Sequence, residues 1–131
     1  MHIHSVDDAR ALYAGGLGPP FPITRRRVAH PPVAQSLARW IELDGCPPEP
    51  RVQPTHWGEA GSANEGHSAT LSTYGPCRDG VEVAHWKLTG AGHVWPGGKP
   101  EFLERILGPS TTIIDANTEI WRFFSRFTLP R

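Results

Sequence analysis

The chain has no excess of charge of either sign. Its 131 residues carry 13 Lys and Arg against 13 Asp and Glu, so the formal net charge is zero. Binding to nucleic acid or to an anionic membrane by charge needs a basic patch. The one basic run, RRR at 25–27, is short and lies near prolines. We therefore expect a solvated loop at 25–27 and no nucleic-acid partner.

Long apolar runs are also missing. No segment approaches the roughly 20 apolar residues that a membrane-spanning helix needs, so no membrane span is expected. The sequence opens with MHIHS, which lacks the basic and then apolar pattern of a secretory signal peptide. The length and a hydrophobic content of 38% are typical of one globular domain, which we assign to residues 1–131.

Cysteine is scarce. Cys46 and Cys77 are the two cysteines, and they form no C-x-x-C motif, which argues against zinc-ribbon or thioredoxin chemistry. From the residues alone they are either two thiols or one disulfide, depending on the compartment. A metal site at His2-x-His4 is a weak hypothesis, because no third ligand has a matching spacing. We expect no metal and no cofactor.

Glycine and proline are abundant, with 14 of each, which indicates many turns and ordered loops. Between these loops the hydrophobic pattern predicts strands and helices. Expected strands cover residues 1–5, 68–75 and 81–90, the last two around an Asp-Gly hairpin signal. Expected helices cover 31–45, 100–107 and 115–127, the last with Asp115 as its N-cap.

Each long helix has an apolar stripe that predicts its buried face. The first stripe is Val33, Leu37, Trp40 and Ile41, and the second is Ala116, Ile120, Phe123, Phe124 and Phe127. Trp40 and Trp121 are both expected in the core. Both faces of the strand at 81–90 are mostly apolar, which indicates cover on both sides. The order of elements predicts the edge of an α/β sheet.

Polar residues follow two of the expected strands. His93, in GAGHVWPGG at 90–98, comes after one strand, and Asp7 and Asp8 follow the strand that holds His4. Ligands bind at the carboxyl ends of strands in open α/β sheets, so an acid and a histidine can meet there. An imidazole oriented by a carboxylate is the general-base half of a catalytic triad.

Two motifs carry a resemblance to a known family. GAGHVWPGG followed by STTIIDANTEIWRFF resembles the C-terminal signature of the extracellular polyhydroxybutyrate depolymerase and feruloyl esterase-like serine hydrolases, which have the α/β-hydrolase fold. HIHSVDDARALYAGG resembles the family's acid motif, H-G-T-x-D-x-x-V-P-Y-x-G-G. Aligning His4 and Tyr13 places the family's aspartate on Asp8. Because several positions depart from the pattern, Asp7 stays an alternative.

The resemblance implies further roles. It implies a catalytic pair of His93 and Asp8, a disulfide between Cys46 and Cys77, and export of the full-length protein to the periplasm or outside the cell. The substrate would be an ester, either a poly(3-hydroxyalkanoate), a feruloyl or acetyl ester, or a small ester. Trp95 fits either packing of the histidine loop or contact with substrate.

The family's nucleophile motif, G-x-S-x-G, is absent from this sequence. GHSAT at 66–70 is the nearest segment, and Ser68 precedes an expected strand instead of a helix, so we interpret Ser68 as an ordinary residue. We expect the chain to be the C-terminal part of an α/β-hydrolase sheet, about 150 or more residues short of a whole domain. It should be inactive alone and inclined to self-association through an unpaired edge at MHIHS. The alternative is a small non-enzymatic domain that binds a ligand or partner at the same edge.

Overall fold

The strands and helices follow one another in an order close to the expected one. The computed structural model describes residues 1–99 and 104–128. The strands are β1 (His2–Ser5), β2 (Gly16–Leu17), β3 (Ala29–His30), β4 (Arg51–Val52), β5 (His56–Trp57), β6 (Ser68–Tyr74) and β7 (Val83–Thr89). The helices are α1 (Val33–Asp44), α2 (Glu104–Leu107) and α3 (Ala116–Phe124), with a 3-10 turn at Arg78–Gly80.

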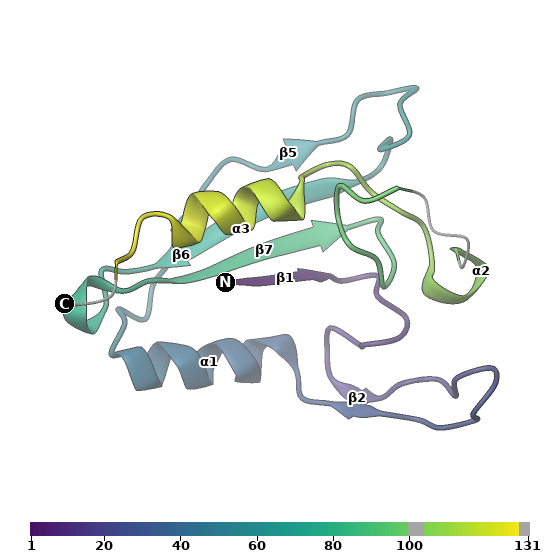
Figure 1. Ribbon diagram of the computed structural model, residues 1–131, viewed down its shortest axis with the longest axis horizontal. Helices are drawn as coiled ribbons and strands as arrows, with labels where there is room; N and C mark the ends of the chain where they lie inside the picture. Colours follow the sequence, from purple (N-terminus) through teal and green to yellow (C-terminus); the bar gives the residue numbers. More distant parts are fainter. Residues whose placement is uncertain (100–103, 129–131) are drawn as a thin grey trace.

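One mixed sheet organises the molecule. Its strand order is β1-β7-β6-β4, and β5 pairs with β6 beside β4. β1 runs parallel to β7, with His2 opposite His85, whereas β6 and β7 are antiparallel. Helices α1 and α3 lie on opposite sides of this sheet (Figure 1). The α/β class expected from the sequence is confirmed.

Two apolar clusters fill the space between the sheet and the helices. On the α1 side, Val33 and Leu37 pack with Val83. On the other side, Trp86 and Leu88 pack with further buried residues of β6 and of the segment before α3. Side chains alternate along a strand, so successive residues of β7 supply both clusters. β7 is therefore covered on both faces, as its composition predicts.

A disulfide joins the two cysteines. Cys46 and Cys77 are bonded over a separation of 31 residues. Cys46 follows the left-handed Gly45 that ends α1, and Cys77 lies in the connection from β6 to β7. The bond therefore ties the C-terminal end of α1 to the hairpin, and the expected pairing is confirmed.

The expected helix 100–107 lies only partly within the described residues, where α2 begins at Glu104 and residues 100–103 are outside. The polar segment 47–68, which shows no period in the sequence, contains two short strands, β4 and β5. Both pair with β6, so contacts distant in sequence create them. Such pairing overrides weak local preference, which is why pattern alone misses these strands.

Three aromatic side chains expected to be buried are exposed. Trp40 is 59% exposed, Trp121 is 73% exposed and Phe124 is 54% exposed, so these predictions were wrong. Trp40 and Phe124 line a cavity with Met1 and His2 beside β1. They lie where the two helices reach the edge of the sheet, and no described strand continues beyond β1 to cover them.

Candidate catalytic site at the ends of β1 and β7

The loops that follow β1 and β7 bring a carboxylate and an imidazole together. Asp8 Oδ2 lies 2.8 Å from His93 Nδ1, although 85 positions separate the two residues. The parallel pairing of β1 and β7 explains the contact, because parallel strands end at the same edge of the sheet. The two residues named from the sequence therefore meet.

Asp8 is held rigidly. Its side chain is only 6% exposed, and its Oδ1 accepts the backbone N–H groups of Arg10 and Ala11, both at 2.8 Å. One carboxylate oxygen therefore orders the loop while the other faces His93. The side chain of Asp7 has a different partner, because its Oδ2 accepts the backbone N–H of Gly90 at 2.6 Å. The structure thus brings Asp8 to the histidine, while Asp7 links the β1 loop to the end of β7.

The glycines of the histidine loop permit close backbone approach. A Cβ on Gly92 would lie 2.1 Å from the carbonyl oxygen of Leu107, and a Cβ on Gly97 would meet Asp115 at 2.6 Å. The loop is also hydrogen-bonded to the end of α2, since His93 N–H donates to Leu107 O at 2.6 Å. Ala116 N–H donates to the carbonyl of Pro96 at 2.9 Å. These contacts fix the backbone on which His93 stands.

The contact with Asp8 determines the tautomer of His93. A carboxylate only accepts hydrogen bonds, so Nδ1 carries a proton, and in the neutral imidazole Nε2 then has the lone pair. Within residues 1–99 and 104–128, no group hydrogen-bonds to Nε2. The imidazole is 51% exposed and lines a cavity of about 330 Å³ together with Asp8 and Trp95. A proton acceptor therefore stands at an open site.

Trp95 is 55% exposed in that cavity. The exposed part of the indole is available to a ligand next to His93.

Sequence reasoning missed the role of His4. Its Nε2 donates to the carbonyl of Ala11 at 2.7 Å and lies 3.5 Å from Asp8 Oδ2. His4 therefore closes the loop that carries the acid, four residues from it. The available signal was the short spacing His4 to Asp8, which places both at the end of one strand.

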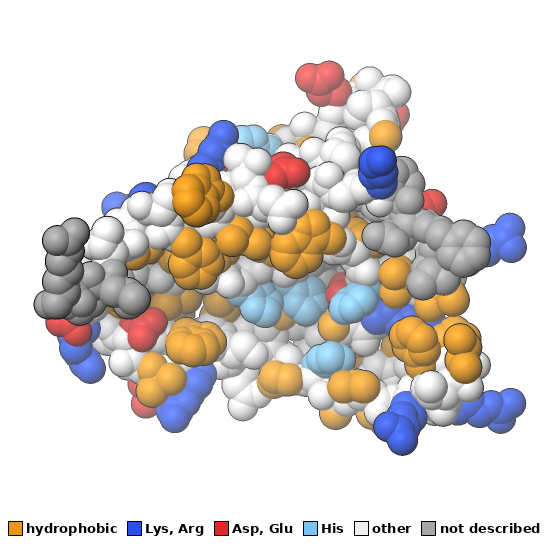
Figure 2. All heavy atoms as spheres, in the orientation of Figure 1, with side chains coloured by type: hydrophobic (Ala, Val, Ile, Leu, Met, Phe, Trp, Pro, Cys, Tyr) orange, Lys and Arg blue, Asp and Glu red, His pale blue; other side chains and the backbone are white. Residues whose placement is uncertain are grey.

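Further histidines continue from His4 along β1, and Figure 2 shows histidine side chains gathered along this line. His2 Nε2 lies 3.2 Å from His4 Nδ1. His85 Nδ1 donates to the carbonyl of His2 at 3.3 Å, and Tyr13 OH donates to His85 Nε2 at 2.9 Å. Burial lowers the pKa of His85 to about 4, and burial followed by the nearby His4 lowers the pKa of His2. Both rings are accordingly neutral at pH 7.

The hydroxyl groups of the two serines nearest the sequence motifs, Ser5 and Ser68, already have hydrogen-bond partners. Ser5 lines it, but the residue is 4% exposed and its Oγ accepts the N–H of Asp7 at 3.2 Å. Ser68 lies at the start of β6, also buried, and its Oγ is 2.7 Å from Thr89 Oγ1. Ser68 does not line the cavity beside His93.

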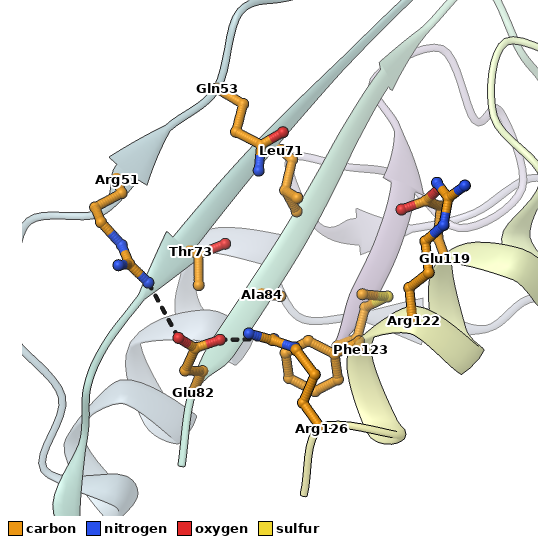
Figure 3. A pocket seen from close by; sticks show the side chains of 11 residues that line it. Arg51, Gln53, Leu71, Thr73, Glu82, Ala84, Glu119, Arg122, Phe123 and Arg126 are labelled. Carbon is orange, nitrogen blue, oxygen red and sulfur yellow. Dashed lines mark hydrogen bonds and ion pairs between the residues drawn. The ribbon is translucent and has the colours of Figure 1, made fainter. Parts of the chain in front are cut away.

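A second cavity, of about 460 Å³, lies between α3 and the sheet. Figure 3 shows Glu82 there between Arg51 and Arg126, with its two carboxylate oxygens at 3.0 and 2.7 Å from the guanidinium groups. A further pair joins Arg122 to Glu119 at 2.7 Å. Both carboxylates are paired with arginines, and among the described residues that line this cavity none is an oriented base of the kind that His93 provides.

In the described part of the chain, no group of three or more His, Cys, Asp or Glu side chains is arranged to hold a metal ion. No helix there is long and apolar enough to cross a membrane.

Comparisons of the chain with known protein families, with curated proteins and with solved structures find no match. Any statement about activity therefore depends on the motifs and on the geometry of the site.

Proposed function

We propose that this chain supplies the general base, His93, and its orienting acid, Asp8, to a serine-type hydrolase of carboxylic esters. The observation that carries the proposal is the 2.8 Å contact between Asp8 Oδ2 and His93 Nδ1, in an imidazole that lines a cavity. This arrangement stabilises the imidazolium that forms when Nε2 accepts a proton. The motif resemblance to polyhydroxybutyrate depolymerases and feruloyl esterases points to the same chemistry.

In this mechanism the nucleophile is a serine outside these 131 residues. Its hydroxyl oxygen bonds to the ester carbonyl carbon while its proton passes to His93 Nε2. Nε2 then returns the proton to the alcohol oxygen as the carbon–oxygen bond breaks, which leaves an acyl-serine. A water molecule attacks that carbonyl by the same proton path and releases the acid. Asp8 accepts no proton in these steps and stabilises the imidazolium.

The unpaired edge of the sheet at β1 supports the proposal that further polypeptide completes the fold. β1 pairs with β7 on one side, and no described strand pairs with its other side. The exposed Trp40 and Phe124 flank that side. In an α/β-hydrolase arrangement, neighbouring parallel strands would cover both features and carry the nucleophile elbow. The chain alone is then a base and an acid without nucleophile or oxyanion donors, and it hydrolyses no ester at an appreciable rate.

The disulfide is compatible with an extracellular compartment, since such bonds persist where conditions are oxidising. Export of the full-length protein is part of the proposal.

Adjacent aspartates offer a matched pair of variants. Asp8→Asn replaces the acceptor at His93 Nδ1 with an amide, so the imidazole loses its fixed tautomer, whereas Asp7→Asn leaves that contact intact. The ¹⁵N shifts of the His93 ring report the tautomer directly. We expect an Nδ1–H signal in the wild type and in Asp7→Asn, and its loss in Asp8→Asn. An Nε2–H tautomer in the wild type would refute the assigned base.

The source of the nucleophile has its own test. Fluorophosphonate labelling followed by mass spectrometry should find no adduct on this chain, at Ser5 and Ser68 in particular. A labelled serine within these residues would overturn the proposed division of the triad. An in-frame G-x-S-x-G segment encoded upstream of Met1 would support it.

A further inference from the structure

A second, apolar pocket lies next to His93. Its volume is about 330 Å³, and His93 forms part of its wall. Its apolar lining comes from the segment between β2 and β3 and from α2, namely Pro19, Phe21, Val28 and Leu107. Cavities of this size hold small organic ligands. The imidazole therefore stands between this pocket and the cavity that contains Trp95.

Arg10 holds the pocket open. Its Nε donates to the carbonyl of Ile106 at 2.8 Å, and its Nη1 donates to the carbonyl of Pro20 at 3.1 Å. The guanidinium carbon lies 5.7 Å from the centre of the Phe21 ring. Arg10 follows Asp8 by two positions, so one side chain joins the acid loop, α2 and the β2–β3 segment.

The ionisable side chains in the pocket lining are basic. They are Arg10, Arg26, His30 and His93, and no described carboxylate lines the pocket. Figure 2 shows basic and hydrophobic side chains together at the end of the molecule where Figure 1 places β2. The guanidinium of Arg26 forms no hydrogen bond or ion pair with the described residues, and its backbone N–H donates to Thr24 Oγ1 at 3.4 Å. Its guanidinium is therefore available to an anion at the pocket.

The geometry points to a binding site for a hydrocarbon group that carries a carboxylate. Phe21, Val28 and Leu107 would contact the hydrocarbon, and Arg26 would pair with the carboxylate by charge-assisted hydrogen bonds. As part of a substrate site this inference rests on the proposed function, since the ester bond would then lie beside His93. The pocket would select esters whose acid or alcohol portion has an anionic end.

The direct test is binding of 3-phenylpropionate to the purified chain, followed by chemical-shift changes. 3-Phenylpropionamide is its uncharged counterpart. Phe21→Ala removes a wall of the pocket, and its matched control is Ile23→Ala, since Ile23 is 88% exposed in the same segment and does not line the pocket. Arg26→Gln removes the proposed cation, and Arg25→Gln removes an equal charge outside the pocket.

We expect 3-phenylpropionate to shift the signals of Phe21, Val28 and His93. Phe21→Ala and Arg26→Gln should each weaken binding at least about threefold, while both controls stay within error. The amide should bind the wild type more weakly than the acid. Equal losses in the control variants, equal binding of acid and amide, or no shifts at these residues would each overturn the inference.

Two independent measurements on the wild-type chain, binding of 3-phenylpropionate and the tautomer of His93, separate this inference from the proposed function. If the wild type shows the Nδ1–H tautomer of His93 but does not bind 3-phenylpropionate, the pocket alone is refuted. If it binds 3-phenylpropionate without that tautomer, the base alone is refuted.

Discussion

Removal of the disulfide should destabilise the protein by several kcal/mol. The bond joins Cys46 to Cys77 over 31 residues, and a closed loop of that length lowers the entropy of the unfolded chain. The loop-closure relation at this length gives roughly 3.5 kcal/mol at 25 °C. Domains are typically stable by only about 5–15 kcal/mol, so this bond is a large share of the total.

The perturbation is the double variant Cys46→Ala, Cys77→Ala, compared with oxidised and reduced wild-type protein. Urea unfolding followed by circular dichroism measures the free energy of unfolding. The double variant and the reduced wild type should both lose roughly 3–4 kcal/mol, with a fall in Tm of roughly 10–15 °C. Agreement between these two samples separates the cross-link from the effect of the alanine side chains.

Two results would refute this reasoning. A free-thiol count of two in denatured, unreduced wild type would show that the bond does not form. A loss below about 1 kcal/mol with the bond formed would show that the unfolded chain is already restricted in this loop.

Two other perturbations test the environment of the candidate site. The lowered pKa of His85, about 4 against an ordinary 6.5, means that the unfolded chain takes up this proton first as the pH falls. The free energy of unfolding should therefore be highest above pH 6.5 and fall by roughly 2–3 kcal/mol toward pH 4. His85→Gln should reduce this fall. The control His56→Gln, at an exposed position, should not. Gly92→Ala would place a methyl group against Leu107 O and should lower the free energy of unfolding by roughly 1–3 kcal/mol, measured by thermal unfolding. It should also shift the ring signals of His93. An unchanged Tm and spectrum would contradict the close packing assigned to this loop.

Local patterns predicted the long elements well. The stripe from Val33 predicted α1, and Gly45 takes the left-handed conformation expected at its end. Asp115 accepts the N–H of Thr118 at 2.7 Å and so caps α3 as expected. These features depend on residues a few positions apart, which is the range over which sequence periodicity and capping act.

Exposure could not be predicted in the same way. Trp40 lies almost in line with Val33 around α1, yet one is 59% exposed and the other 2%. Helical spacing gives the direction of a side chain but not the extent of the sheet beneath it. At Trp40 the sheet ends at β1, so the apolar face has no described strand to cover it.

The amino-acid sequence by itself determined the class of the fold, the two segments that hold an acid and a histidine, and the types of side chain that meet there. Motif alignment placed the acid on Asp8 but left Asp7 as an alternative. Tertiary structure decided that Asp8 faces His93, and it alone decided that His4 and Arg10 brace the same loop. The physical reason is that these contacts join residues as many as 96 positions apart, through the parallel pairing of β1 with β7 and the packing of α2. Local sequence around Asp7 and Asp8 does not determine which carboxylate faces His93, because the pairing of β1 with β7 brings the imidazole close.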